Sequence, residues 1–510
     1  MELVHHFNTS NMASSSSSSF PDIWTWIQNL PPITEWTSNS VSISIFSSSS
    51  FRPSLKLSIS KKLQSSSFVI FSLFADYSEI ISLWTSKSIR INPKSVNLLD
   101  HEDNVSKIFL TLVDVILQYC PNKNISLFRL PKLSSVTNFK EIFNFSFLTL
   151  SFLICIYEAP TDLRSECLHR LKEHYACEQS REASKLLMRL LGSNVEEQWM
   201  RAVNLAITNW IVEVQAKNTA LKTPSSLFSY GNSTFGMWKV QLFCPVIAMD
   251  LEKSSNPSPD EKVVFSLNYH QVEGVIQLNH RVIIRDSWIE VVARVDNIRC
   301  DIVKLVNDTL MKERGAGKAE KHFPSRISLQ LTPIQQMNVL SISVSKSSEN
   351  PIRDISSEKT VEGSLNPPNT LGLNISAGET VTVSLKPWKF EQSVYGNSGN
   401  LNWYLHDSVN GREVFSSKPS MFSLLNPRAW FKNRYKNVYR PFTRQGGIIF
   451  ADDEYGENVV WKVDKSARGK VMEWEIRGWI WLTYWPNKHR TFYTETRRLE
   501  FREIVQLTLA

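Results

Sequence analysis

The spacing of apolar residues changes near Phe235, and this change constrains the fold more than any other feature of the 510-residue chain. Upstream, apolar residues recur every three or four positions, which is the spacing of one helix face. The clearest such series is Trp199, Val203, Ala206, Trp210 and Val214. Downstream, apolar and polar residues alternate in short runs such as Val263–Tyr269 and Ile289–Val295, as they do in half-buried strands. The sequence therefore predicts a helical middle and a large antiparallel β C-terminal half.

Short alternating runs also precede the helical region, for example Val41–Ile45 and Leu55–Ile59, and they predict strands. We therefore expect an α+β protein with short N-terminal strands, a central helical bundle and a C-terminal half that is a β-sandwich or barrel-like. The expected parts are a flexible Ser-rich leader at 1–20, strands plus a helical bundle at 21–221, a linker at 222–234, and a β-sandwich-like domain at 235–510 with a helical insertion at 301–314.

The composition is that of a globular protein and excludes wholesale disorder, with 42% hydrophobic and 21% charged residues. The six cysteines form no C-x-x-C pair, which favours reduced thiols in a cytoplasmic or nuclear protein. No basic region followed by an apolar run begins the chain, so a secretory signal is not expected. The Ser-rich, acid-poor start leaves a plastid location as an alternative, and Met12 is an alternative to Met1 as the start.

One apolar segment, Ile142–Tyr157, carries no charge over 16 residues. A helix that spans a bilayer needs about 20 such residues, and Asn144, Ser146 and Thr149 dilute this one. We therefore expect a buried core helix and favour no transmembrane span. Membrane attachment through 142–157 is retained as an alternative.

The most distinctive charge feature is an acid-free run between Phe415 and Ala451, in a chain with a formal charge of +8. Cations alternate there with aromatic residues, a mixture that suits a phospholipid headgroup, a nucleic acid or an acidic protein. The predicted anion-binding residues are Arg428, Lys432, Arg434, Lys436, Arg440 and Arg444. The alternative is a connecting segment whose aromatic rings pack inward while its charges face water.

Trp479 and Trp481 lie two positions apart in an alternating run and should share one face of a strand. Two such rings could stack on a sugar or another planar ligand. Alternatively, they bury against another part of the protein, because large aromatic side chains dominate buried interfaces.

Motifs for metals and catalysis are absent at the required spacing. Cys167, His169, His174 and Cys177 have residue types that suit zinc. On one helix, however, Cys167 and His174 would lie about 10 Å apart along the axis, too far for a single ion. We therefore predict no metal and no cofactor. The enzyme alternative is a site assembled from His270, His280, His322, His406 and Asp407, with His280 facing inward.

Three stretches, Ser384–Gly396, Arg440–Gly447 and Glu473–His489, resemble a plant-specific protein family of unknown function. The start at Met12 is similar as well, so the resemblance extends from Met12 to the C-terminus. It implies a plant origin and no activity, cofactor or catalytic residue. The leading hypothesis is therefore a non-enzymatic binding or scaffold protein that contacts an anionic partner.

Overall fold

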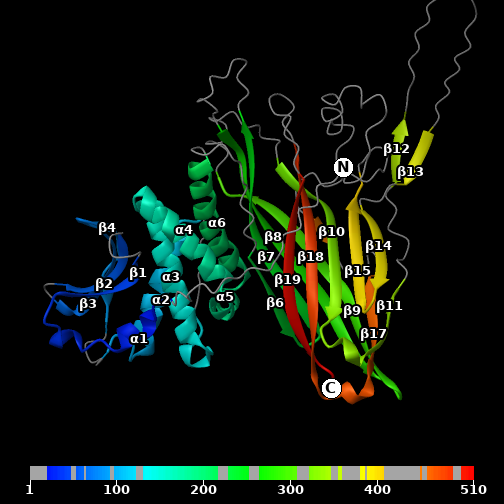
Figure 1. The fold of residues 1–510 in the computed structure, drawn as a ribbon, viewed down its shortest axis with the longest axis horizontal. Coiled ribbons are helices and arrows are strands. Elements are labelled where there is room, and N and C mark those ends of the chain that lie inside the picture. The colour runs from blue at the N-terminus through cyan, green and yellow to red at the C-terminus, as the bar shows by residue number, and fades with distance from the viewer. Residues whose placement is uncertain are drawn as a thin grey trace, which may run out of the picture. The chain divides into compact units, whose positions relative to one another are not determined.

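The computed structural model consists of two compact units, divided between Ala206 and Ile207 (Figure 1). Helices and one antiparallel sheet make up the described part of the first unit, and antiparallel sheets make up nearly all of the described part of the second, which confirms the predicted α+β class. The structure describes residues 20–47, 53–62, 65–91, 97–121, 130–215, 228–251, 264–306, 321–345, 354–358, 380–384, 388–406, 448–450, 457–485 and 496–510.

The first unit begins with the antiparallel sheet that the short alternating runs predicted. Its strands follow the order β1-β2-β3-β4, and β5 pairs with β3. Leu55, Leu57 and Ile59 alternate along β2 and are fully buried. The strand bounds are β1 (Ser40–Ser47), β2 (Ser54–Lys62), β3 (Ser65–Asp76), β4 (Ile80–Thr85) and β5 (Ile89–Arg90).

Helices complete the first unit around the central helix α3, which contacts α1, α2, α4, α5 and β4. Apolar side chains in the first half of α6, including Trp199 and Val203, are buried as their spacing predicted. The helix bounds are α1 (Ile23–Gln28), α2 (Glu102–Gln118), α3 (Phe139–Glu158), α4 (Thr161–Ala176), α5 (Glu178–Leu191) and α6 (Ser193–Gln215).

Helix α3 contains the apolar segment 142–157, and nearly all of its side chains are buried. The hydroxyls of Ser146 and Ser151 donate to the carbonyls of Ile142 and Phe147, each at 2.8 Å, so the helix itself satisfies these buried polar groups. By length and composition α3 could cross a membrane. Within its unit it is the central core helix, as the sequence predicted.

The second unit is built from two open antiparallel sheets that share one core. One sheet has the order β11-β17-β9-β8-β7-β6, with β16 also paired to β9, and the other has the order β14-β15-β10-β18-β19. Side chains from both sheets form a single apolar cluster. Among the described residues the arrangement is therefore a sandwich, and the barrel-like alternative is not supported.

The strands of the first of these sheets are β6 (Phe228–Thr234), β7 (Met237–Leu251), β8 (Val264–Ile284), β9 (Trp288–Lys304), β11 (Val339–Val344), β16 (Ile448–Phe450) and β17 (Asn458–Asp464). The strands of the second are β10 (Lys321–Pro333), β14 (Trp388–Tyr395), β15 (Ser398–Leu405), β18 (Val471–Trp485) and β19 (Thr496–Thr508). A separate pair consists of β12 (Asp354–Glu358) and β13 (Thr380–Ser384).

Two boundary predictions need correction. Part of the predicted linker forms the edge strand β6, because its polar groups have tertiary partners: the buried Glu503 carboxylate accepts hydrogen bonds from Ser229 Oγ at 2.6 Å and from Gly231 N at 2.9 Å. The predicted helical insertion is wrong for residues 301–304, which end β9 and pair with β8. Residues 307–314 of that insertion lie outside the described residues.

Gly478 allows β18 and β19 to pack closely, because it lies directly opposite Phe501 on the inner face. A Cβ at this position would lie 2.0 Å from Phe501 Cζ. We expect Gly478→Ala to lower the free energy of unfolding by about 1–3 kcal/mol through overpacking, as measured by urea denaturation. The double variant with Phe501→Leu should recover part of this loss. An unchanged stability in Gly478→Ala would contradict the packing described.

Candidate functional site

The outer face of the β14-β15-β10-β18-β19 sheet carries a line of residues in register, one from each strand. We call it the cation–aromatic row, because cations and aromatic rings alternate along it without a carboxylate. In strand order the row consists of Lys389, Tyr404, Arg326, Trp481 and Arg498.

Arg326 lies at the centre of the row, between two rings. Its guanidinium carbon lies 4.7 Å from the ring centroid of Tyr404 and 4.3 Å from that of Trp481, both within the range of a cation–π contact. Arg326 Nη2 also donates to Asn402 Oδ1 at 3.2 Å, and Ser328 Oγ donates to the same oxygen at 2.7 Å. These contacts hold the planar guanidinium in one orientation on the face of the sheet.

The carboxylates near the row belong to neighbouring positions on the same face. Lys389 Nζ lies 2.5 Å from Glu391 Oε1, and Arg498 Nη2 lies 3.9 Å from Glu500 Oε2. The side chains of these pairs are between 36% and 59% exposed, so each pair contributes little to stability. An incoming anion could therefore replace these carboxylates at small cost.

Trp479 and Trp481 lie on the same face of β18, as their spacing predicted, and both are partly buried. Each ring already faces an arginine, since the Arg477 guanidinium carbon lies 5.1 Å from the Trp479 ring centroid. Arg477 is itself paired with Glu500. Only one position of this pair, Trp481, belongs to the cation–aromatic row, and stacking of a ligand on either ring stays a prediction.

The predicted anion-binding residues Arg428, Lys432, Arg434, Lys436, Arg440 and Arg444 lie outside the described residues, as does Asp407. Sequence reasoning did not single out Lys389, Tyr404, Arg326 or Arg498. Each is a cation or an aromatic residue at an outward-facing position of an alternating strand. The alternation alone could have indicated that these side chains lie on the outer face of the sheet. Their alignment depends on strand register, which no local pattern specifies.

Of the histidines proposed for the enzyme alternative, His270 and His322 lie in contact. His270 on β8 and His322 on β10 are buried between the sheets, with their Nδ1 atoms 3.2 Å apart. Burial, followed by the nearby His270 and Arg497, lowers the pKa of His322 well below its usual value. His280 is instead half-buried, with its ring 4.9 Å from that of Trp238, and burial lowers its pKa as well. His406 follows β15 and is also half-buried.

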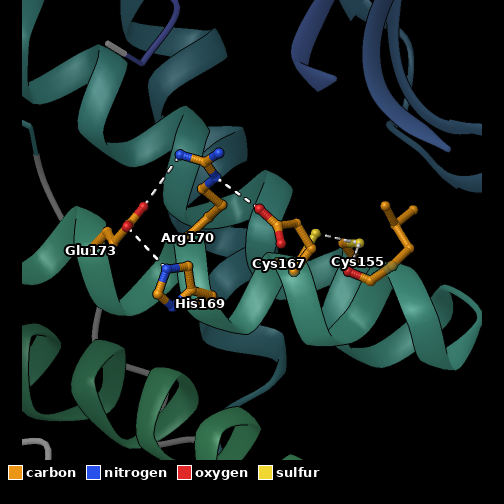
Figure 2. A network of polar contacts seen from close by, with 7 residues as sticks. Cys155, Cys167, His169, Arg170 and Glu173 are labelled. Carbon is orange, nitrogen blue, oxygen red and sulfur yellow. Dashed lines mark hydrogen bonds and ion pairs between the residues drawn. The ribbon is translucent and has the colours of Figure 1, made fainter. Parts of the chain in front are cut away.

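Of the four residues that suited zinc, Cys167, His169 and His174 lie on α4, and Cys177 directly follows this helix. Figure 2 shows Cys167 and His169 with different neighbours. Cys167 is buried beside Cys155, whereas the exposed His169 forms an ion pair with Glu173 at 3.1 Å. His174 is buried and stacks on Phe145 at a centroid distance of 4.1 Å. Within the described ranges, no group of three or more His, Cys, Asp or Glu side chains is placed to hold a metal ion.

Comparison with known proteins shows no family. No family model matches the chain, and no curated protein matches it. Solved structures with distant similarity include the membrane-inserted form of the Clostridium perfringens NetB toxin, with 10% identity over 55% of this chain and 94% of that one and a TM-score of 0.19. Another is described as a pore forming protein, with 11% identity, the same coverage and a TM-score of 0.18. TM-scores this low do not support an inference about the fold or the function of this chain.

Proposed function

We propose that the protein is a non-enzymatic binding protein that holds an anionic group at the cation–aromatic row. The proposal rests on the position of Arg326 at the centre of the row, where its guanidinium forms cation–π contacts with both Tyr404 and Trp481. A guanidinium presents a planar fork of N–H donors that matches a carboxylate or a phosphate. Because the rings and Asn402 restrict its motion, little side-chain entropy remains to be lost when an anion binds.

The charges around the row favour a compact anion over a long polyanion. Glu391 and Glu500 lie next to the row on the outer strands, where they would repel a chain of phosphates that extended across the sheet. The rings of Tyr404 and Trp481 offer apolar surface beside the guanidinium. A ligand that combines one phosphate or carboxylate with a planar apolar ring fits this arrangement best.

The proposal is tested with phenyl phosphate as the probe in isothermal titration of the full chain. We expect Arg326→Ala to weaken binding at least about tenfold, because a hydrogen bond to a charged group contributes about 1.5–3 kcal/mol. Arg326→Lys should recover only part of the affinity, since an ammonium lacks the fork. The matched control is Arg502→Ala, which removes an exposed arginine paired with Glu475 on the same face.

Phenol and inorganic phosphate separate the contributions of ring and anion, and each should bind more weakly than phenyl phosphate. Thermal unfolding of each variant shows whether the fold is retained. Arg502→Ala should keep the wild-type affinity. The proposal is wrong if the wild-type protein binds none of the three probes, if Arg326→Ala binds phenyl phosphate as tightly as the wild type, or if Arg502→Ala weakens binding as much as Arg326→Ala does.

A further inference from the structure

The sulfur atoms of Cys155 on α3 and Cys167 on α4 lie 2.6 Å apart (Figure 2). Both side chains are fully buried, and both are free thiols. A disulfide bond is about 2.05 Å long, so the two sulfurs need to approach by less than an ångström to bond. The two helices are consecutive and are joined only through Ala159 and Pro160. The Cys155 and Cys167 side chains point toward one another across this hairpin.

We propose that Cys155 and Cys167 are an oxidative modification site, where a reversible disulfide joins α3 to α4. Twelve positions separate the two cysteines, so the bond would close a short loop. Because α3 is the central helix of the first unit, the bond would fasten α4 to the core of that unit.

Burial controls how this site reacts. It raises the pKa of the Cys167 thiol well above the usual value, and the contact with Cys155 raises it further. The thiolate is the reactive form. The buried thiols therefore react slowly while α4 packs against α3, and oxidation needs a transient separation of the two helices. Further along α4, Arg170 and Glu173 form an ion pair at 3.3 Å, with side chains that are 23% and 40% exposed (Figure 2).

Hydrogen peroxide is a sufficient oxidant. One thiolate attacks a peroxide oxygen and breaks the O–O bond, which yields a sulfenic acid and hydroxide, and the hydroxide takes up the thiol proton as water. The second thiol then attacks the sulfenic sulfur, forms the S–S bond and releases a second water. Overall, two thiols lose two electrons and two protons, and the peroxide is reduced to two waters. A dithiol reductant reverses the change by thiol–disulfide exchange.

The experiment exposes the folded full-length chain to hydrogen peroxide, removes the peroxide with catalase, and alkylates the remaining thiols after unfolding. Peptide mapping by mass spectrometry should find a cross-link between Cys155 and Cys167 that disappears on reduction. The cross-link should persist in Cys244→Ser, which removes another buried thiol, and be lost in Cys155→Ser. The oxidised wild type should unfold about 5 °C or more above the reduced form, because the cross-link restricts the unfolded chain.

The wild-type measurement does not depend on whether Cys155→Ser folds. Absence of the cross-link from the peroxide-treated wild type overturns the proposal. A cross-link that lowers the unfolding temperature also overturns it, since the bond would then distort the native helices instead of fitting them.

Discussion

Replacing Trp474 by alanine is expected to lower the free energy of unfolding of the second unit by about 3–5 kcal/mol, the usual cost of removing a buried Trp. Trp474 is fully buried on the inner face of β18. Its ring lies 5.4 Å from that of Trp238 on β7 and 6.0 Å from that of Trp461 on β17. The three tryptophans thus join the two sheets, and alanine would leave a cavity between them.

Urea denaturation, followed by far-ultraviolet circular dichroism, measures this loss. The matched control is Trp479→Ala, which removes the same side chain from the outer face of the same strand and should cost about 1 kcal/mol or less. Trp474→Phe should cost less than Trp474→Ala, because it keeps an aromatic ring. It also removes an indole N–H that has no hydrogen-bond partner among the described residues. Equal losses at Trp474 and Trp479 would contradict the assignment of inner and outer faces.

Acidification is expected to destabilise the first unit by about 3 kcal/mol between pH 6.5 and pH 4 through His174. Burial lowers the pKa of His174 from 6.5 to about 4, although the hydrogen bond to the Phe145 carbonyl opposes the shift. The unfolded chain therefore binds a proton below about pH 6.5 that the folded unit still rejects. His174 thus contributes stability that is fully present above pH 6.5 and is lost as the pH falls toward 4.

The measurement is the free energy of unfolding as a function of pH for the wild type and for His174→Phe, which keeps a ring against Phe145 but cannot titrate. The variant should lose less stability than the wild type over this pH interval. His169→Gln is the matched control, because His169 lies on the same helix with its side chain 67% exposed, and it should retain the wild-type pH dependence. Identical slopes for all three proteins would show that His174 does not carry the effect.

The local sequence pattern was sufficient to predict which side chains enter the cores. Alternation in β18 correctly separated the buried Trp474 and Ile476 from the outward Trp479 and Trp481. Three- and four-residue spacing correctly identified the buried face of α6 through Trp199 and Val203. Both predictions succeed because the period of an element decides which of its residues share a face.

Contacts between distant segments could not be predicted in this way. Residues 228–234 look polar, but they form β6 by pairing with β7. Glu503, more than 270 positions later, accepts hydrogen bonds from Ser229 and Gly231 of this strand. The last residues of β9 pair with β8, which overrides the local preference that suggested a helix at 301–304.

The order of helical and strand-rich parts, and the inward and outward faces of their elements, could thus be predicted from the residues alone. Those properties follow from periods of two and 3.6 residues, which are local. The position of Arg326 between Tyr404 and Trp481, and the contact between Cys155 and Cys167, became apparent only from the folded chain. Strand register and helix packing set these distances, and both depend on the fit of whole surfaces, which no single segment encodes.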